Sequence, residues 1–235
     1  MAQTEAMTLM KFIEKFGSEE ACREYLYKAR WPEGFVCPKC GVQDDPFQIN
    51  CRNRYQCKHC THQTSATAGT IMDKTKTPLM KWFLAIYLMS ADKRGCSAMR
   101  LKRELGIAYD TAWTISHKIR NAMSQRDGMY LLQGIVELDD SFFGSPSEGG
   151  KRGRGTDKTP VVIGLSLDEE GHPEYIRAQV VESIDGDELL AFADGNICKG
   201  SEIRSDGFRS YNKLGDSAYR LFTENYDPRQ CGHVI

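Results

Sequence analysis

The chain has 235 residues, of which 40% are hydrophobic, so it can form one large domain or two to three small ones with buried cores. It has no run of about 18 apolar residues, so no membrane-spanning helix is expected. The N-terminus lacks the basic-then-apolar order of a signal peptide. We therefore expect a cytoplasmic protein, in which nine reduced cysteines are available for metal rather than disulfides.

The net charge of −1 hides an asymmetry between the two parts of the chain. Residues 1–133 contain 20 Lys and Arg against 13 Asp and Glu, a net +7, whereas residues 134–235 contain 11 against 19, a net −8. A basic front and an acidic back suggest a nucleic-acid-binding half joined to a half of different purpose. The alternative is simple variation in surface composition.

Two short helices are predicted between residues 8 and 29, because apolar positions recur there at helical spacing. Gly17 interrupts them, and Ser18 is a plausible N-cap for the second helix. A structural role is expected for both.

Two Cys-x-x-Cys pairs follow, separated by sixteen residues. Each pair turns tightly enough to direct two sulfurs at one ion, and four thiolates close a tetrahedral zinc site. The predicted structural Zn²⁺ ligands are Cys37, Cys40, Cys57 and Cys60. Cys51, His59 and His62 are nearby competitors as ligands, but they break the symmetry of the pairs.

A buried helix is predicted over 79–89, followed by a helix-turn-helix pattern. Residues 98–105 and 109–122 form its two helices, joined by a turn that contains Gly106. From residue 93 to 126 the local charge is +6, so the outer helix face is suited to the DNA major groove. The alternative is an ordinary helical hairpin with a solvated basic face. The outward residues proposed to contact DNA are Thr111, Thr114, His117, Lys118 and Arg120.

Two short strands in the acidic half end in carboxylates. The first covers 134–140 and reaches Asp139, and the second covers 202–205 and precedes Asp206. If the two strands are neighbours, these carboxylates meet at one sheet edge and offer the oxygen ligands that Mg²⁺ requires. The alternative is a pair of exposed turn aspartates.

A glycine-rich loop over 144–155 carries three basic residues beside the proposed acidic site. Its Lys151, Arg152 and Arg154 are candidates for clamping a phosphate backbone, and a solvated linker is the alternative. A hairpin over 160–181, a helix over 187–193 and a possible last strand over 219–223 complete the predicted order.

Together these motifs resemble those of insertion-sequence transposases that join an N-terminal zinc ribbon to a ribonuclease-H-like DDE domain. The resemblance lies in the two cysteine pairs with residues 30–35, and in residues 68–70, 111–113, 136–140, 151–155, 158–160 and 206–211. It implies a multidomain α+β protein in which Asp139 and Asp206 are catalytic and hold Mg²⁺ or Mn²⁺. Asp140 stands where the family usually has Glu.

The family's third acid lies on a later helix, after a His-Thr-Asn-type motif that does not occur before Ile235. The resemblance therefore implies a truncated and inactive transposase. The implied partners are double-stranded DNA at the element ends and target, and further copies of the chain on that DNA; no membrane is involved, and the location is the prokaryotic cytoplasm, at the nucleoid.

The expected domains are N-terminal helices over 1–30, the zinc ribbon over 31–70, the helix-turn-helix region over 71–130 and an incomplete ribonuclease-H-like domain over 131–235. The expected activity is metal-dependent phosphodiester cleavage and strand transfer. The alternatives are a non-catalytic DNA-binding remnant or repressor, and an unrelated nuclease of the same fold.

Overall fold

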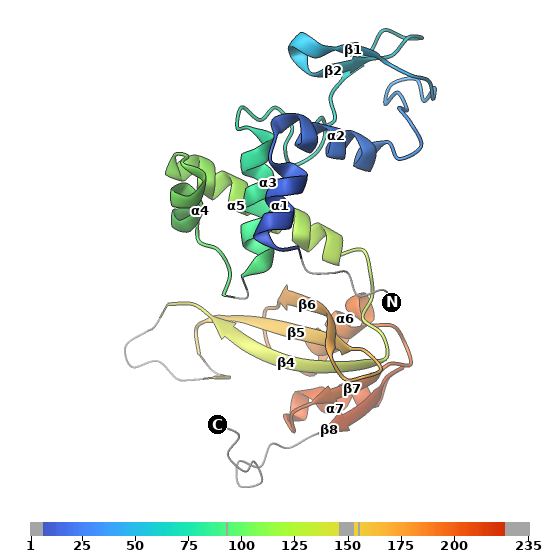
Figure 1. Cartoon of the computed structure of the whole chain (residues 1–235). Helices are drawn as coiled ribbons and strands as arrows, with labels where there is room; N and C mark the ends of the chain where they lie inside the picture. Colours follow the sequence, from blue (N-terminus) through green and yellow to red (C-terminus); the bar gives the residue numbers. More distant parts are fainter. Residues whose placement is uncertain (1–6, 93, 146–152, 155, 224–235) are drawn as a thin grey trace. The chain divides into compact units, whose positions relative to one another are not determined.

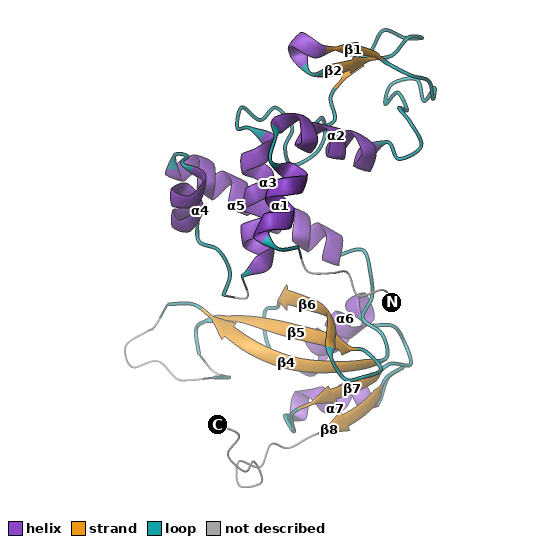
Figure 2. Ribbon diagram, viewed as in Figure 1, coloured by secondary structure: helices purple, strands orange, loops and turns teal. Residues whose placement is uncertain are grey.

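The computed structural model describes residues 7–92, 94–145, 153–154 and 156–223 (Figures 1 and 2). The chain divides into two compact units, Met1–Met123 and Ser124–Ile235. In the described part of the chain, no helix is long and apolar enough to cross a membrane.

The first unit begins with the two predicted short helices. Helix α1 (Leu9–Phe16) is capped by Thr8, and α2 (Glu19–Arg30) is capped by Ser18, whose hydroxyl accepts a hydrogen bond from the Ala21 amide at 3.1 Å. Such caps satisfy amides that the first turn leaves without partners.

The zinc-ribbon segment is a three-stranded antiparallel sheet with small strands. It comprises β1 (Phe47–Ile49), the 3₁₀ turn η1 (Asn50–Arg52), β2 (Arg54–Gln56) and β3 (Gln63–Thr64). Its small core is aromatic, with Trp31, Phe35 and Tyr55 packed beside the cysteines.

Three further helices complete the first unit: α3 (Leu79–Ala91), α4 (Ala98–Leu105) and α5 (Tyr109–Asp127). Gly106 ends α4 with φ +58°, a left-handed conformation that favours glycine. The core of these helices includes Ala112, Ile115 and Ile119 of α5.

The second unit is a five-stranded mixed sheet of order β6-β5-β4-β7-β8. Strands β4 (Ile135–Phe143), β5 (Thr159–Leu167) and β6 (Pro173–Val180) are antiparallel, while β7 (Glu202–Ser205) and β8 (Arg220–Thr223) extend the sheet in parallel from β4. This is the ribonuclease-H-like arrangement, so the predicted fold class is confirmed.

Helix α6 (Gly186–Asn196) provides the core of the second unit, together with η2 (Arg209–Tyr211) and α7 (Asn212–Gly215). Phe192 of α6 lies close to Gly164 of β5, where an added Cβ would come 2.8 Å from Leu132 Cδ1 and 3.4 Å from Phe192 Cε1. A side chain at residue 164 would therefore force these buried neighbours to move.

Candidate functional site

The two predicted carboxylates follow paired positions on neighbouring parallel strands. Leu138 of β4 pairs with Ser205 of β7, and both are buried. Asp139 and Asp206 are the next residues on each strand, and both are exposed. Because the strands are parallel, Asp139 and Asp206 both come just beyond the last residue pair of β4 and β7. The predicted end of the first strand at residue 140 was wrong, since β4 continues to Phe143 and Asp139 lies within it.

A third carboxylate, that of Asp140, is joined to the carboxylate of Asp206 through Arg154. Its side chain is only 3% exposed, and the guanidinium of Arg154 lies between the two acids. Arg154 donates from Nε to Asp140 Oδ1 at 3.1 Å and from one terminal nitrogen to Asp206 Oδ2 at 2.9 Å. A cation therefore occupies the space between these carboxylates.

Aromatic residues that follow Asp206 hold this ion-paired group. The ring of Phe208 stacks under Arg154, with 3.6 Å from Cζ to the ring centroid. The hydroxyl of Tyr211, a residue only 1% exposed, donates to Asp140 Oδ1 at 3.1 Å. Burial, and then the charges of Asp140, Asp206 and Asp139, raise the pKa of Tyr211, so this phenol stays protonated and donates to Asp140.

The sequence alone did not assign these roles to Phe208, Tyr211 or Asp140. Tyr211 lies five residues after Asp206 in the stretch that carries the family resemblance, and this closeness is the signal that could have identified it. Asp140 adjoins Asp139 on β4, but its burial depends on contacts with Arg154 and Tyr211, which are distant in the sequence.

The acidic group is chemically suited to a hard divalent cation, because carboxylates are the ligands that Mg²⁺ and Mn²⁺ prefer. The position of Arg154 shows that a positive charge is stable there. In the described residues, however, the three carboxylates do not form a group with all ligand atoms within 4.8 Å of one another. Asp139, Asp140 and Asp206 are the residues that would hold the ion.

The four predicted zinc ligands do come together. Their sulfurs all lie within 4.8 Å of one another, with Cys37 and Cys60 3.5 Å apart and Cys40 and Cys57 3.7 Å apart. A tetrahedral site with Zn–S bonds of about 2.3 Å separates its sulfurs by ~3.8 Å. The cluster thus has the geometry of a structural zinc site, as the sequence predicted.

The two cysteine turns have matching hydrogen bonds. The carbonyl of Cys37 accepts from the Gly41 amide at 2.9 Å, and that of Cys57 accepts from the Thr61 amide at 3.1 Å. Burial raises the pKa of the Cys37 thiol, but amides of Cys40 and Lys39 and neighbouring thiols outweigh it and lower the pKa to about 6. The turns therefore stabilise the thiolate form that binds metal.

The residues proposed for the DNA-reading helix face have unequal surroundings on α5. Thr114 and His117 are exposed, and His117 stacks on Trp113 at 3.9 Å between ring centroids. Lys118 lies 5.9 Å from the Trp82 ring, and Arg120 donates to the carbonyl of Cys96 at 3.0 Å.

Lys118 and Arg120 therefore contact residues outside α5 within the first unit. Thr111 is half-buried. DNA contact by this face stays a prediction.

The basic loop is only partly described. Lys151 and Arg152 lie outside the described residues, while Arg154 binds carboxylates in the arrangement given above. Its proposed role in clamping phosphate therefore requires it to leave Asp140 and Asp206.

These features define a class of protein that combines a four-cysteine ribbon, a helical region and a ribonuclease-H-like domain with acids just beyond the paired residues of two neighbouring parallel strands. Residues 17–63 match the family described as transposase zinc-ribbon domain, of the IS1595 type. Residues 131–232 match the ISXO2-like transposase domain of the same type. The chain belongs to the IS1595-type insertion-sequence transposases.

A relative from Halobacterium salinarum, described as an uncharacterized protein in transposable element ISH50, is 27% identical over 240 residues. The match covers 95% of this chain and 78% of the relative.

Among solved structures, a Mos1 transposase paired-end complex with the left transposon end aligns at 10% identity and a TM-score of 0.21, covering 60% of this chain and 58% of the other. The Mos1 strand transfer complex aligns at 11% and 0.23, covering 62% and 59%. The chain thus spans less than two thirds of the Mos1 chains, and TM-scores of this size establish nothing about it.

Proposed function

We propose that the chain binds duplex DNA and that its acidic group of Asp139, Asp140 and Asp206 serves metal-dependent cleavage and joining of phosphodiester bonds. The observation that carries the proposal is that Asp140 of β4 and Asp206, which follows β7, share the guanidinium of Arg154, with Asp139 adjoining Asp140 on β4. Acids delivered by neighbouring parallel strands are suited to metal-assisted phosphoryl transfer.

Bound Mg²⁺ or Mn²⁺ would activate a water or a DNA 3′-hydroxyl and stabilise the leaving oxygen. Asp139 and Asp206 are exposed and reach solvent, so we assign them the direct contact with the ion. Asp140 is nearly buried, and Tyr211 holds one of its oxygens. We therefore assign Asp140 to orienting the group.

The ion pairs of Arg154 support the alternative function, which is DNA binding without cleavage. While the guanidinium bridges Asp140 and Asp206, it competes with any divalent cation for the same oxygens. A chain that keeps this bridge binds DNA without cutting it, which is the behaviour of a repressor or remnant. The predicted inactivity of these 235 residues belongs to this alternative, and pairing of copies on DNA is proposed for both functions.

The test is strand cleavage of an end-labelled duplex that contains the element's terminal sequence, with Mg²⁺ or Mn²⁺. Cleavage that is lost in both Asp139→Asn and Asp206→Asn supports the catalytic function. DNA binding without cleavage in either metal supports the binding-only alternative. Cleavage that survives both substitutions contradicts the assignment of the acids.

A further inference from the structure

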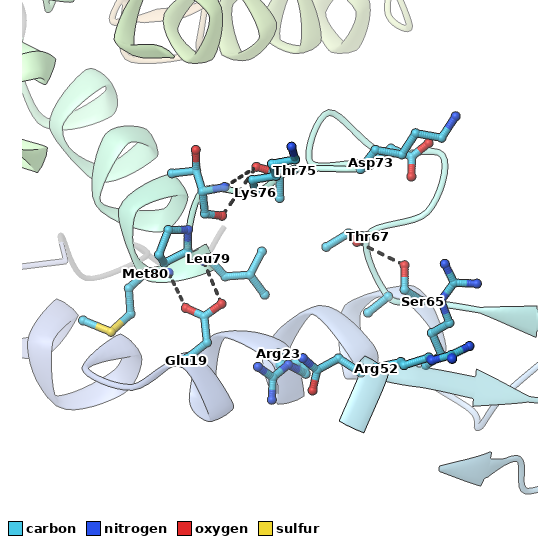
Figure 3. Close-up of a pocket in the computed structure, with 16 residues that line it drawn as sticks. Glu19, Arg23, Arg52, Ser65, Thr67, Asp73, Thr75, Lys76, Leu79 and Met80 are labelled. Atoms are coloured by element: carbon cyan, nitrogen blue, oxygen red, sulfur yellow. Dashed lines mark hydrogen bonds between the residues drawn. The ribbon is translucent and has the colours of Figure 1, made fainter. Parts of the chain in front are cut away.

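The first unit contains a basic groove that no residue of α5 lines. It has a volume of about 760 Å³ and is lined by α2, by the turn between β1 and β2, and by residues 65–80 (Figure 3). Arg23 and Arg52 lie on one side of the view, and Asp73, Thr75 and Lys76 lie on the other. We call it the ribbon groove.

Positive charge dominates this lining. Five basic side chains come from three separate segments, against two acidic ones; the basic residues are Arg23, Arg52, Arg54, Lys74 and Lys76, and the acidic residues are Glu19 and Asp73. Both carboxylate oxygens of Glu19 are already used, since they accept from the amides of Leu79 at 2.9 Å and Met80 at 3.2 Å.

Most of these cations are available to a ligand. Arg52, Arg54, Lys74 and Lys76 are exposed, and none of them has an ion pair within the part of the chain that the structure describes. Arg23 has one contact, with Glu20 at 3.6 Å. Concentrating unpaired like charges costs free energy in the absence of an anion.

The walls of the ribbon groove are fixed by buried or half-buried contacts. Arg30 donates to the backbone carbonyls of Ser65 at 3.3 Å and Ala66 at 3.1 Å, which holds one wall. Trp82 Nε1 donates to Thr75 Oγ1 at 2.9 Å, which holds the opposite wall. Lys74 has φ +53°, a conformation that is uncommon for a long side chain and fixes its direction.

We propose that the ribbon groove binds the phosphate backbone of duplex DNA. Its cations are distributed along an open groove and come from three segments, which suits a chain of phosphates better than a single small anion. Lysine and arginine without base-reading geometry supply affinity and register rather than sequence choice. This inference rests on the proposed DNA binding and assigns it to a surface other than the helix-turn-helix.

The test measures binding of a fluorescein-labelled 30-base-pair duplex to the full chain by anisotropy at several salt concentrations. Two double variants of the groove are tested. The first combines Lys74→Gln with Lys76→Gln, and the second combines Arg52→Gln with Arg54→Gln. The matched control, Lys199→Gln with Arg220→Gln, removes the same charge from exposed residues outside the groove. Zinc content and circular dichroism verify the folding of each variant.

Each lost phosphate contact lowers the salt slope by about 0.9, so either groove variant should lose ~1.8 of slope and on the order of 60-fold in affinity at 0.1 M salt. The control should bind as the wild type does. Equal losses of affinity in the groove variants and the control, or an unchanged salt slope in both groove variants, would contradict DNA binding by the ribbon groove. Failure of the wild-type chain to bind DNA would instead overturn the proposed function.

Discussion

Replacing Arg154 by alanine should strengthen divalent metal binding by the acidic group. In the structure the guanidinium holds an oxygen of Asp206, which is assigned to direct contact with the ion, and an oxygen of Asp140, which orients the group. Metal entry therefore requires these hydrogen bonds to break, and the substitution removes that cost in advance.

The magnitude follows from the exposure of the partners. The Asp140 side chain is 3% exposed, and a hydrogen bond to such a charged group contributes about 2 kcal/mol. The Asp206 side chain is 49% exposed, so its pair with Arg154 adds at most a few tenths of a kcal/mol. About 2 kcal/mol corresponds to ~30-fold tighter Mn²⁺ binding.

Isothermal titration with Mn²⁺ measures this change directly. Arg209→Ala is the control, because Arg209 is an exposed arginine three residues after Asp206 with no ion pair in the described residues. It should change the affinity much less. Without metal, Arg154→Ala should also lower the melting temperature, since Asp140 loses its cation, and Mn²⁺ should restore part of the loss. Unchanged or weaker Mn²⁺ binding by Arg154→Ala would refute the competition.

Three further predictions concern the framework of the two units. Cys40→Ser should lose bound zinc, measured by elemental analysis, and unfold the ribbon, whereas Cys51→Ser, an exposed cysteine outside the cluster, should retain the metal. Glu19→Gln should lower the free energy of unfolding by about 1–2 kcal/mol in urea, because a neutral amide caps the first turn of α3 less well, while Glu24→Gln, at an exposed carboxylate paired with Lys28, should change it much less. Gly164→Ala should destabilise by about 1–3 kcal/mol because its Cβ would meet Leu132, whereas Gly195→Ala, with open space around it, should be neutral or stabilising; equal effects in thermal unfolding would contradict the packing argument.

Features that depend on a few neighbouring residues were predictable from the sequence. The Ser18 cap, the Gly106 turn and the cysteine pairs each depend on a few consecutive positions, and the structure has all of them. The order of strands and helices in the second unit was predictable for the same reason. Asp139 and Asp206 were singled out because each follows a short apolar run, although β4 continues past Asp139 to Phe143 while β7 stops at Ser205.

Contacts between distant segments were not predictable. Arg154 meets Asp206 across 52 positions, and Glu19 meets Leu79 across 60. Charge alone made Arg154 a candidate for phosphate binding, whereas its actual partners depend on how the loop returns to the sheet. The ribbon groove likewise exists only when three segments fold together, so no single stretch of sequence indicates it.

Direct measurement of metal at the acidic group tests the central claim best. Electron paramagnetic resonance should detect Mn²⁺ bound to the full chain, and binding should weaken at least tenfold in Asp139→Asn and in Asp206→Asn, because each substitution replaces one of two direct carboxylate ligands with a neutral amide. Glu137→Gln, an exposed carboxylate two residues earlier on the same strand, should leave the binding unchanged. Mn²⁺ binding that is equally strong in all three variants would contradict the assignment of a metal site to Asp139 and Asp206.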